Sequence, residues 1–381
     1  MKILWVNPSF LDYRIPVYKK IFELNNKNFF LIYSKNRVPQ RVISKIESAI
    51  GDHAIGLSDE LVLNFKSKSD FANTEFKIPY QPGLYNAILK VDADIIIGEG
   101  FFQWTPMAIL IAKLKKRKLL IAYERTAHTE RNCPKWRALY RKFISKFVDG
   151  YSINGSLTKD YLIQLGVKAD QLFVGGMSAD SENLVASFNS VSLNEIQALK
   201  SKLLLRNGLT FLYIGQINER KGVIPLLEAW KSHNKLYPND NLILIGTGPL
   251  YDKCKEDFSH IDSIYLIGSI DYDLIHHYYA IANVFIIPTL EDNWSLVVPE
   301  AMSCGLPIAC SIYNGCYPEL VQEGLNGKLF DPLKETSVID ALAYFHNKDL
   351  EQMGKESKNI EKKYNASSVA LNIYNMCNEI I

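Results

Sequence analysis

The stretch VFIIPTLEDNWSLVVPEAMSCGLPIACS, residues 284–311, contains one complete unit of the fold that the whole chain predicts. Its apolar ends, 284–288 and 307–311, have the composition of buried strands. Between them Ser295 is a favourable N-cap for a helix over 296–303, and a glycine follows where the C-terminal cap should be. A strand, a helix and a second strand in this order predict two parallel strands joined by a crossover helix.

The same alternation continues in both directions along the chain. In the first half we expect strands at 2–7, 29–34, 60–65, 94–99, 119–124, 150–154 and 172–176. In the second half we expect strands at 209–215, 241–246, 264–268, 284–288, 307–311 and 327–330, with an all-helical segment from 334 onward. The β/α rhythm stops only at 177–195, which is rich in Ser and Asn. The pattern therefore predicts an α/β fold with two doubly wound, Rossmann-like domains.

The bulk composition indicates a globular protein that stays in the cytoplasm. Apolar residues make up 48% of the chain and charged residues 22%, and no apolar run reaches the ~18–20 residues that a membrane span needs. The first ten residues predict a strand rather than a signal peptide. The six cysteines form no CxxC pair. We interpret Cys304, Cys310 and Cys316 as reduced, buried thiols rather than metal ligands, because no histidine lies near them in the sequence.

Charge is divided unevenly along the chain. Residues 1–180 carry 27 Lys and Arg against 17 Asp and Glu, whereas the remaining residues carry 16 against 24, so the net charge of +2 hides a basic half and an acidic half. One basic cluster, 135–146, also contains Trp136, Leu139, Tyr140 and Phe143 at helical spacing. Two interpretations stay open: peripheral contact with an anionic membrane, or a solvated helix whose apolar stripe faces the core. No nucleic-acid recognition motif is present, and nucleic-acid binding is not predicted.

Two loops after strands in the second half have features of an anion site. The segment QINERKG follows Gly215 and places Lys221 at the start of a helix, so backbone N–H groups and a cation would converge on a phosphate. An ordinary surface loop would have the same composition. After the next strand come Gly246 and Gly248, which fit either close approach to a nucleotide or a tight turn.

The quoted stretch places carboxylates beside a helix N-terminus, which favours an anion such as a diphosphate. Glu300 lies one turn into the predicted helix among apolar neighbours, so we expect a buried carboxylate with a partner, such as the vicinal hydroxyls of a ribose. Asp292 and Glu291 lie in the loop before it.

Together these segments resemble the nucleotide-sugar domain of the GT-B glycosyltransferases, in the large retaining group called glycosyltransferase family 4 or group 1. The resemblance runs over 211–332, in GQINERKG, LILIGTGPL, IYLIGSI, the quoted stretch and GLNGKLFDP, in the family's order and spacing. It implies an acceptor-binding domain over 1–180, a nucleotide-sugar domain over 181–365 and a last helix over 366–381 that packs back on the first domain. It also implies a retaining hexosyl- or N-acetylhexosaminyl-transferase without a bound metal.

The family's motifs carry over onto particular residues of this chain. Its Glu-x7-Glu pair falls on Asp292 and Glu300: Glu300 would hold the ribose hydroxyls, and Asp292 would face the donor sugar. The backbone of Trp294, Ser295 and Leu296 would hold the distal phosphate.

The family's Arg-x4-Lys pair falls on Gln216 and Lys221, and Lys221 would neutralise the diphosphate leaving group. The sequence departs twice from the pattern. Gln216 replaces the arginine, for which Arg220 could substitute, and Asp292 replaces a glutamate. Glu291 has the family's side chain one residue too early, and we favour Asp292.

Loops after strands in the first half are expected to face the acceptor. The candidates are Tyr13 and Arg14 after the first strand, Glu99 after the strand at 94–99, and Glu124, Arg125 and His128 in the segment ERTAHTER. The family often has a histidine near the reacting centre at this last place, which His128 or Glu124 would fill. The DAD motif at 92–94 precedes a strand, so it is not expected to bind a metal.

We therefore expect transfer of a sugar from a nucleoside diphosphate sugar, with UDP as the expected nucleotide, to a glycan or lipid-linked acceptor in polysaccharide or lipopolysaccharide assembly. The enzyme would work in the cytoplasm, on the inner face of the membrane if the basic helix binds lipid. Two alternatives remain: a nucleotide-sugar 2-epimerase of the same architecture, and a non-catalytic scaffold that binds a nucleotide sugar. The departures from the family pattern at Gln216 and Asp292 support the scaffold.

Overall fold

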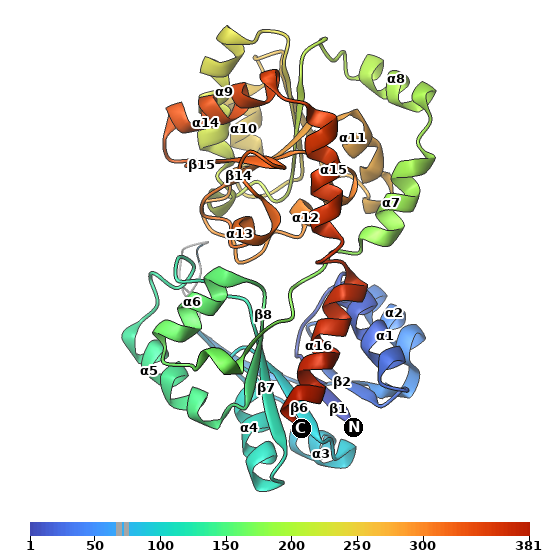
Figure 1. Ribbon diagram of the computed structural model, residues 1–381, viewed down its shortest axis with the longest axis vertical. Helices are drawn as coiled ribbons and strands as arrows, with labels where there is room; N and C mark the ends of the chain where they lie inside the picture. Colours follow the sequence, from blue (N-terminus) through green and yellow to red (C-terminus); the bar gives the residue numbers. More distant parts are fainter. Residues whose placement is uncertain (66–70, 72–75) are drawn as a thin grey trace. The chain divides into compact units, whose positions relative to one another are not determined.

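The computed structural model describes residues 1–65, 71 and 76–381, which form two compact units (Figure 1). The first unit contains Met1–Asp180 and Tyr364–Ile381, and the second contains Ser181–Lys363. Each unit has its own parallel sheet covered by helices, which is the α/β fold with two Rossmann-like domains that the strand pattern predicted.

The sheet of the first unit has the strand order β3-β2-β1-β6-β7-β8-β9, and all its neighbouring strands are parallel. Its strands are β1 (Ile3–Val6), β2 (Phe29–Ser34), β3 (Ala54–Leu57), β6 (Ile95–Glu99), β7 (Lys118–Tyr123), β8 (Gly150–Ile153) and β9 (Leu172–Val174). The order reverses between β1 and β6. Such a switch point opens a crevice at the carboxyl ends of the strands, where open α/β sheets bind ligands.

Helices cover both faces of this sheet. They are α1 (Arg14–Leu24), α2 (Gln40–Ile50), α3 (Leu84–Val91), α4 (Thr105–Leu114), α5 (Lys135–Ile144), α6 (Ser156–Gln164) and α16 (Ala366–Ile380). The last helix, α16, packs against α1, although the whole second unit separates them in the sequence (Figure 1). Its apolar residues Val369, Ala370 and Ile373 join the same buried cluster as Tyr18 and Ile21 of α1.

The strand predicted at 60–65 is present but lies outside the parallel sheet. It is β4 (Leu61–Phe65), which pairs with β5 (Phe76–Tyr80) in a separate antiparallel hairpin. Leu61 and Leu63 are exposed, which is incompatible with a strand covered on both faces. The place at the edge of the sheet belongs to β3, a short AIGL segment that the apolar pattern did not reveal.

The sheet of the second unit has the order β12-β11-β10-β13-β14-β15, also fully parallel. Its strands are β10 (Thr210–Ile214), β11 (Asn241–Ile245), β12 (Ile264–Gly268), β13 (Val284–Ile287), β14 (Ile308–Ser311) and β15 (Gly327–Phe330). All six strands predicted from the second half are therefore confirmed. The switch point lies between β10 and β13, the strands that precede QINERKG and LEDNWS.

The helices of the second unit are α7 (Ser181–Ser190), α8 (Leu193–Lys202), α9 (Val223–Leu236), α10 (Tyr251–Phe258), α11 (Ile275–Ile281), α12 (Val297–Ser303), α13 (Tyr317–Leu320), α14 (Glu335–Tyr344) and α15 (Leu350–Glu361). The segment 177–195, where the rhythm stopped, contains α7 and the start of α8. Ser192 and Glu195 form a capping box at α8, so part of the polar composition reflects a helix start.

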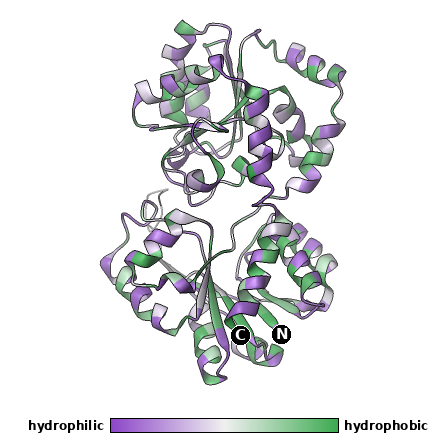
Figure 2. Ribbon diagram, viewed as in Figure 1, coloured by the Kyte–Doolittle hydropathy of each residue, from purple (hydrophilic) through white to green (hydrophobic). Residues whose placement is uncertain are grey.

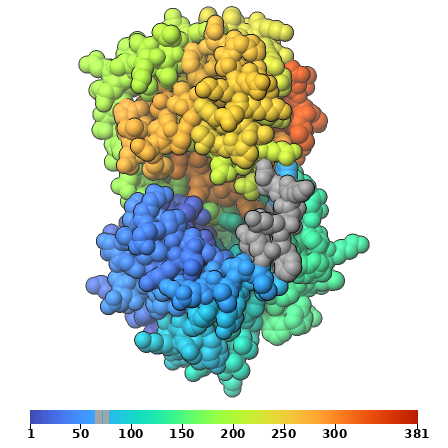
Figure 3. Space-filling model, turned by 180° about the vertical axis from the view of Figure 1, so that it is seen from behind, coloured from blue at the N-terminus to red at the C-terminus, as the bar shows by residue number. Residues whose placement is uncertain are grey.

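Hydropathy follows this layering. The central strands are hydrophobic, whereas the helices carry hydrophobic and hydrophilic residues together (Figure 2). On the face shown in Figure 3, the yellow and orange part of the chain, with α10 and α11, covers much of the second unit. Among the described residues, no helix has the length and apolar content needed to cross a membrane.

We expect Gly246→Ala to destabilise the second unit by about 3 kcal/mol or more, because the new Cβ would lie 1.9 Å from the carbonyl oxygen of Gly215. Gly324→Ala is the matched control: its φ is +84°, but nothing lies within 4 Å of its Cβ, so only backbone strain of about 1 kcal/mol is expected. Urea unfolding of both variants measures the difference. Equal losses would show that the contact between the two loops is not tight.

Candidate functional site

Two loops meet at the switch point of the second sheet. The carbonyl oxygen of Arg220, in the loop after β10, accepts hydrogen bonds from the backbone N–H of Leu290 at 2.8 Å and from the hydroxyl of Thr289 at 3.1 Å, both in the loop after β13. Gly222 has φ +66°, and a Cβ there would lie 2.1 Å from the carbonyl oxygen of Pro288. The close approach therefore requires glycine and fixes one loop against the other.

This junction brings Lys221 and Asp292 together. The Lys221 ammonium forms an ion pair with the Asp292 carboxylate, and both side chains are largely buried. Asn218 accepts a hydrogen bond from the backbone N–H of Lys221 at 3.1 Å and so shapes the turn that presents the lysine. On the other side, the Ser295 hydroxyl donates to Asp292 at 2.7 Å, and the Trp294 backbone N–H donates to it at 3.2 Å.

The environment of Asp292 keeps it ionised. Burial raises the pKa of this carboxyl, but the Lys221 ammonium and the Ser295 hydroxyl outweigh burial and hold its pKa below the usual range. The loop after β14 adds a third support, because the backbone N–H of Gly315 donates to the carbonyl oxygen of Asp292 at 2.9 Å. A carboxylate and an ammonium are thus fixed side by side at the carboxyl edge of the sheet.

The structure corrects the predicted helix start. The helix α12 begins at Val297 with Leu296 as its N-cap, and no side chain caps it. Ser295 is not the N-cap, because its hydroxyl donates to Asp292 instead of accepting from the helix backbone. The predicted glycine at the other end is in place: Gly305 has φ +82° directly after the C-cap residue.

Glu300 lies on α12 and is buried, as expected, with partners at both oxygens. Tyr272 donates to one oxygen and Tyr279 to the other, each at 3.1 Å. Burial raises the pKa of Tyr279 well above its usual value, and the negative charge of Glu300 raises it further. Each carboxylate oxygen can accept more than one hydrogen bond, so the two tyrosines orient Glu300 without exhausting it.

The other predicted donor-side residues surround this centre. Gly215 and Gly246 lie in adjacent loops after β10 and β11, and their close packing explains the glycine at 246. Gln216 is exposed, and its side-chain oxygen accepts from Asn218 at 3.2 Å. Arg220 adds a positive charge near Asp292, and its Nε is buried without a hydrogen-bond partner among the described residues.

A second cluster lies at the switch point of the first sheet. Arg14, at the start of α1, donates to Glu99 at the end of β6 at 2.9 Å, and the indole N–H of Trp5 donates to the other Glu99 oxygen at 2.9 Å. Burial raises the pKa of Glu99, against the opposing effect of Arg14. Arg14, Glu99 and Glu124 line a small common cavity, and Tyr13 lies close enough for Arg14 and Glu124 to influence its pKa.

Arg125 and His128 do not line that cavity. Arg125 donates to Glu130 at 3.0 Å, and Glu130 also pairs with the buried Arg141 of α5 at 2.7 Å. His128 lies in the turn after β7, where its carbonyl oxygen accepts from Arg131. The structure therefore joins the predicted residues into two clusters, one around Lys221 and Asp292 and one around Arg14 and Glu99.

Several supporting residues were not predicted from the sequence. They are Trp5, Glu130, Asn218, Tyr272 and Tyr279. Asn218 carried a detectable signal, since Asn is a frequent N-cap and a short helical turn follows it. The two tyrosines carried no such signal, because the sequence does not distinguish a tyrosine that donates to a buried carboxylate from an aromatic residue of the core.

The fold and part of the sequence are similar to those of known glycosyltransferases. Residues 195–363 match the family described as "Glycosyl transferases group 1". A protein from Anabaena, HepE, whose structure in complex with UDP is known, superposes over all of both chains with a TM-score of 0.74 at 14% sequence identity. This likeness confirms the GT-B fold for the chain. The stretch that matches the group 1 family lies within the second unit.

Curated relatives match different shares of the chain. An alpha-monoglucosyldiacylglycerol synthase of Acholeplasma laidlawii is 30% identical over 177 residues, which are 45% of this chain and 44% of the relative. A sulfoquinovosyl transferase of Arabidopsis thaliana is 24% identical over 323 residues, 80% of this chain and 60% of the relative. The chain thus spans about half the length of the curated relatives it matches.

We expect Asp292→Asn to destabilise the second unit by about 1–3 kcal/mol at neutral pH, because it leaves the mostly buried Lys221 without its carboxylate. The folded-state pKa of Asp292 is depressed, so its contribution is present above the ordinary value of 3.8 and is lost as the pH falls below it. The variant should therefore lose less stability than the wild type on acidification below about pH 4. Urea unfolding at several pH values measures both effects.

Glu228→Gln is the control for this experiment, because it breaks an exposed ion pair with Lys231 in the same unit. We expect a change within about 0.5 kcal/mol. If Asp292→Asn behaves like this control at every pH, the buried pair contributes nothing to stability.

Proposed function

We propose that the protein is a retaining glycosyltransferase that moves a hexosyl or N-acetylhexosaminyl group from a UDP-sugar to a glycan or lipid-linked acceptor in cell-envelope assembly. The observation that carries the proposal is the Lys221–Asp292 pair at the switch point of a group 1 domain. A parallel α/β sheet binds its ligand at this place, and a diphosphate requires a cation there.

The donor would be held from two sides. Glu300, oriented by two tyrosine hydroxyls, would accept hydrogen bonds from the ribose. Lys221 and Arg220 would face the diphosphate, and the first turn of α12 has no side-chain cap that would compete for its N–H groups. Arg220 would then take the role of the arginine that Gln216 replaces. HepE binds UDP on the same fold, which supports UDP as the nucleotide.

The reaction would depend on charge stabilisation at the leaving group. Breaking the bond between the anomeric carbon and the diphosphate develops positive charge on the sugar and negative charge on the phosphate. Lys221 would stabilise the phosphate, and the fixed Asp292 carboxylate would face the sugar. Because Asp292 neutralises Lys221 before substrate binds, both groups are held in place in advance. These interactions supply the catalysis without a metal ion.

The first unit would bind the acceptor. Arg14 and Glu99 form an oriented polar pair at the switch point of its sheet, with Tyr13 and Glu124 beside them. We assign these four residues to acceptor positioning. His128 and Arg125 stay candidates at the edge of this group.

The helix α5 supports a lipid-linked acceptor. Its exposed side carries Trp136, Leu139 and Phe143, of which 47%, 68% and 56% of the surface is accessible. Its two central arginines, Arg137 and Arg141, instead point into the unit. This orientation is the reverse of a solvated helix with an apolar stripe in the core, so it favours the membrane interpretation.

Exposed lysines at 135, 142 and 146 accompany the apolar side chains, which suits a surface of anionic lipid. The relative from Acholeplasma laidlawii is named for a diacylglycerol product, which agrees with a lipid acceptor. We place the enzyme on the inner face of the cytoplasmic membrane.

The two rival functions make different predictions in the same assays. A 2-epimerase would convert the UDP-sugar without any acceptor. A scaffold would bind the nucleotide sugar but transfer nothing to a broad acceptor panel. The intact Lys221–Asp292 pair favours an enzyme, because a scaffold has no need of a preformed charge pair at the leaving group.

We expect Lys221→Ala and Glu300→Ala each to lower turnover at least 100-fold, because the first removes the cation at the leaving group and the second removes the ribose contact. A thermal-shift screen of UDP-sugars with the wild type identifies the donor, since binding raises the melting temperature by mass action. Turnover is then measured with that donor, and the anomeric configuration of the product by NMR. Wild-type turnover in either variant, or inversion, would contradict the proposal.

The neighbouring carboxylates provide the control. We expect Asp292→Asn to lose turnover as strongly as Lys221→Ala, and Glu291→Gln to keep most of it. The opposite result would assign the sugar-facing role to Glu291.

We expect the double variant Leu139→Ser/Phe143→Ser to bind anionic vesicles at least about 10-fold more weakly than the wild type, because two apolar side chains no longer insert into the lipid. Co-sedimentation with vesicles of anionic and of zwitterionic lipid measures this effect. Leu204→Ser removes a leucine of the second unit that is still more exposed, at 82%, and should not change binding. Equal binding of all three proteins would leave α5 as an ordinary solvated helix.

A further inference from the structure

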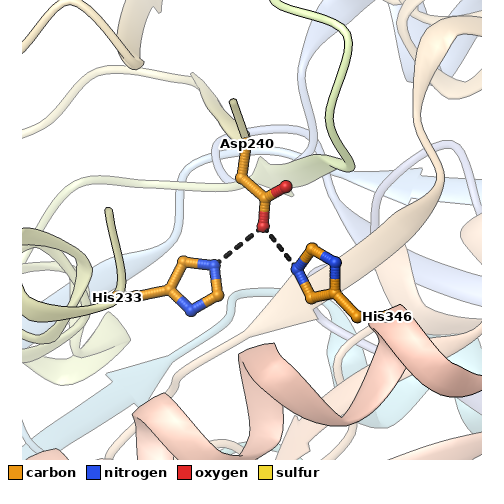
Figure 4. A group of neighbouring side chains, drawn as sticks. All are labelled: His233, Asp240 and His346. Atoms are coloured by element: carbon orange, nitrogen blue, oxygen red, sulfur yellow. Dashed lines mark hydrogen bonds and ion pairs between the residues drawn. The ribbon is translucent and has the colours of Figure 1, made fainter. Parts of the chain in front are cut away.

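Three potential metal ligands converge at the opposite edge of the second sheet. His233 lies on α9, Asp240 directly precedes β11, and His346 belongs to the 3-10 turn Phe345–Asn347 after α14 (Figure 4). One ligand atom of each residue lies within 4.8 Å of those of the other two. The residues are 7 and 106 positions apart in the sequence, so the fold rather than a local motif brings them together.

The cluster is built around one carboxylate oxygen. Both imidazole Nε2 atoms lie 2.8 Å from the same oxygen of Asp240, as the dashed lines in Figure 4 mark. The other oxygen of Asp240 accepts from the backbone N–H of Leu209 at 2.9 Å, which fixes the orientation of the carboxylate. The ring of His346 is stacked on Tyr237 with centroids 3.9 Å apart, so that ring is also held.

The charge of Asp240 has no ordinary partner. Its side chain is buried, and in the described part of the chain it forms ion pairs with His233 and His346 but with no lysine or arginine. A buried carboxylate is stable only when it is paired with a cation or coordinates a metal. The two imidazole nitrogens supply hydrogen bonds to the carboxylate but are not the fixed cation that a lysine or arginine would be.

We propose that His233, Asp240 and His346 form a binding site for a divalent transition-metal ion, with Zn²⁺ as the best match. Two imidazole nitrogens and one carboxylate oxygen are a donor set that Zn²⁺ favours. A tetrahedral ion with bonds of about 2.1 Å separates its ligand atoms by about 3.4 Å, which is about half an ångström more than the 2.8 Å between each Nε2 and the Asp240 oxygen.

The exposure of His346 and the position of the imidazole protons are consistent with such a site. His346 is partly exposed, with 21% of its side chain accessible, so this ligand is close to the protein surface. On binding, each neutral imidazole directs its Nε2 lone pair at the ion and carries its proton on Nδ1. An imidazolium, if present, releases its second proton to solvent.

The surroundings of His233 limit the affinity of the proposed site for a metal ion. The Nδ1 atom of His233 is buried without a hydrogen-bond partner among the described residues, so its proton would lack an acceptor. Missing outer-shell partners typically weaken a metal site 10- to 100-fold. We therefore expect dissociation constants in the micromolar range rather than those of a zinc finger.

The role of the ion would be structural. Asp240 precedes β11, whereas Gly246 of the proposed donor side follows it, and five residues of strand separate the two ends by about 16 Å. The ion would join α9, β11 and the turn after α14, and it would not take part in sugar transfer. The inference is thus independent of the proposed function.

The test uses the whole protein after treatment with a chelator. We expect one Zn²⁺ per chain by titration calorimetry, and an increase of about 5 °C or more in the melting temperature of the second unit at 100-fold excess over the dissociation constant. Co²⁺ should give the intense visible absorption of a tetrahedral site. His346→Ala, at a partly exposed position, should lose all three signals and still fold, as circular dichroism would show.

A second histidine cluster provides the matched control. His276 and His277 have ring centroids 4.0 Å apart, and His277 lies 3.8 Å from Glu195, so they could bind Zn²⁺ at the surface. His277→Ala should leave binding at the proposed site unchanged. The proposal is overturned if the wild type binds no Zn²⁺ under these conditions, or if His346→Ala binds it as the wild type does.

Discussion

The cluster around Lys221 and Asp292 depends on the hydrogen bonds that the carbonyl oxygen of Arg220 accepts. This oxygen accepts hydrogen bonds from Leu290 and Thr289. The nearby Gly222 packs so closely against Pro288 that a side chain at this position would collide with the Pro288 carbonyl oxygen. The loops after β10 and β13 are thereby locked at the one place in the sheet where strand order reverses. This backbone junction holds the main chains of Lys221 and Asp292 side by side, where their side chains form a largely buried ion pair.

Much of this arrangement follows from the sequence, because strand ends and loop composition are local properties. Continuous apolar runs located the strands of both parallel sheets apart from β3. The resemblance to the glycosyltransferase family pointed to Lys221 and Asp292 in loops after strands and to Glu300 in the helix that follows, and the structure has them there. What could not be predicted is competition for a hydrogen bond. Ser295 is a good N-cap by residue type, but its hydroxyl donates to Asp292, which a local rule cannot anticipate.

The sequence also could not predict which side of the helix α5 faces the interior. Its arginines and its apolar residues both recur at helical spacing, so the pattern alone is compatible with either side facing inward. The decision comes from Glu130, a buried carboxylate that pairs with Arg141 and with Arg125. Of these two arginines only Arg141 lies on α5, and its charge-assisted contact to the desolvated carboxylate turns the arginine side of the helix inward. Trp136, Leu139 and Phe143 are left on the surface.

The two ends of the second sheet solve the problem of buried charge differently. At the carboxyl edge, Asp292 has a lysine, a hydroxyl and a backbone N–H as partners, which keep it ionised and oriented. At the amino edge, Asp240 has two imidazoles as partners and, among the described residues, no lysine or arginine. The first arrangement contains its own fixed cation and needs no further ion. The second arrangement lacks a fixed cation. The proposed metal ion would supply the positive charge that a buried carboxylate requires.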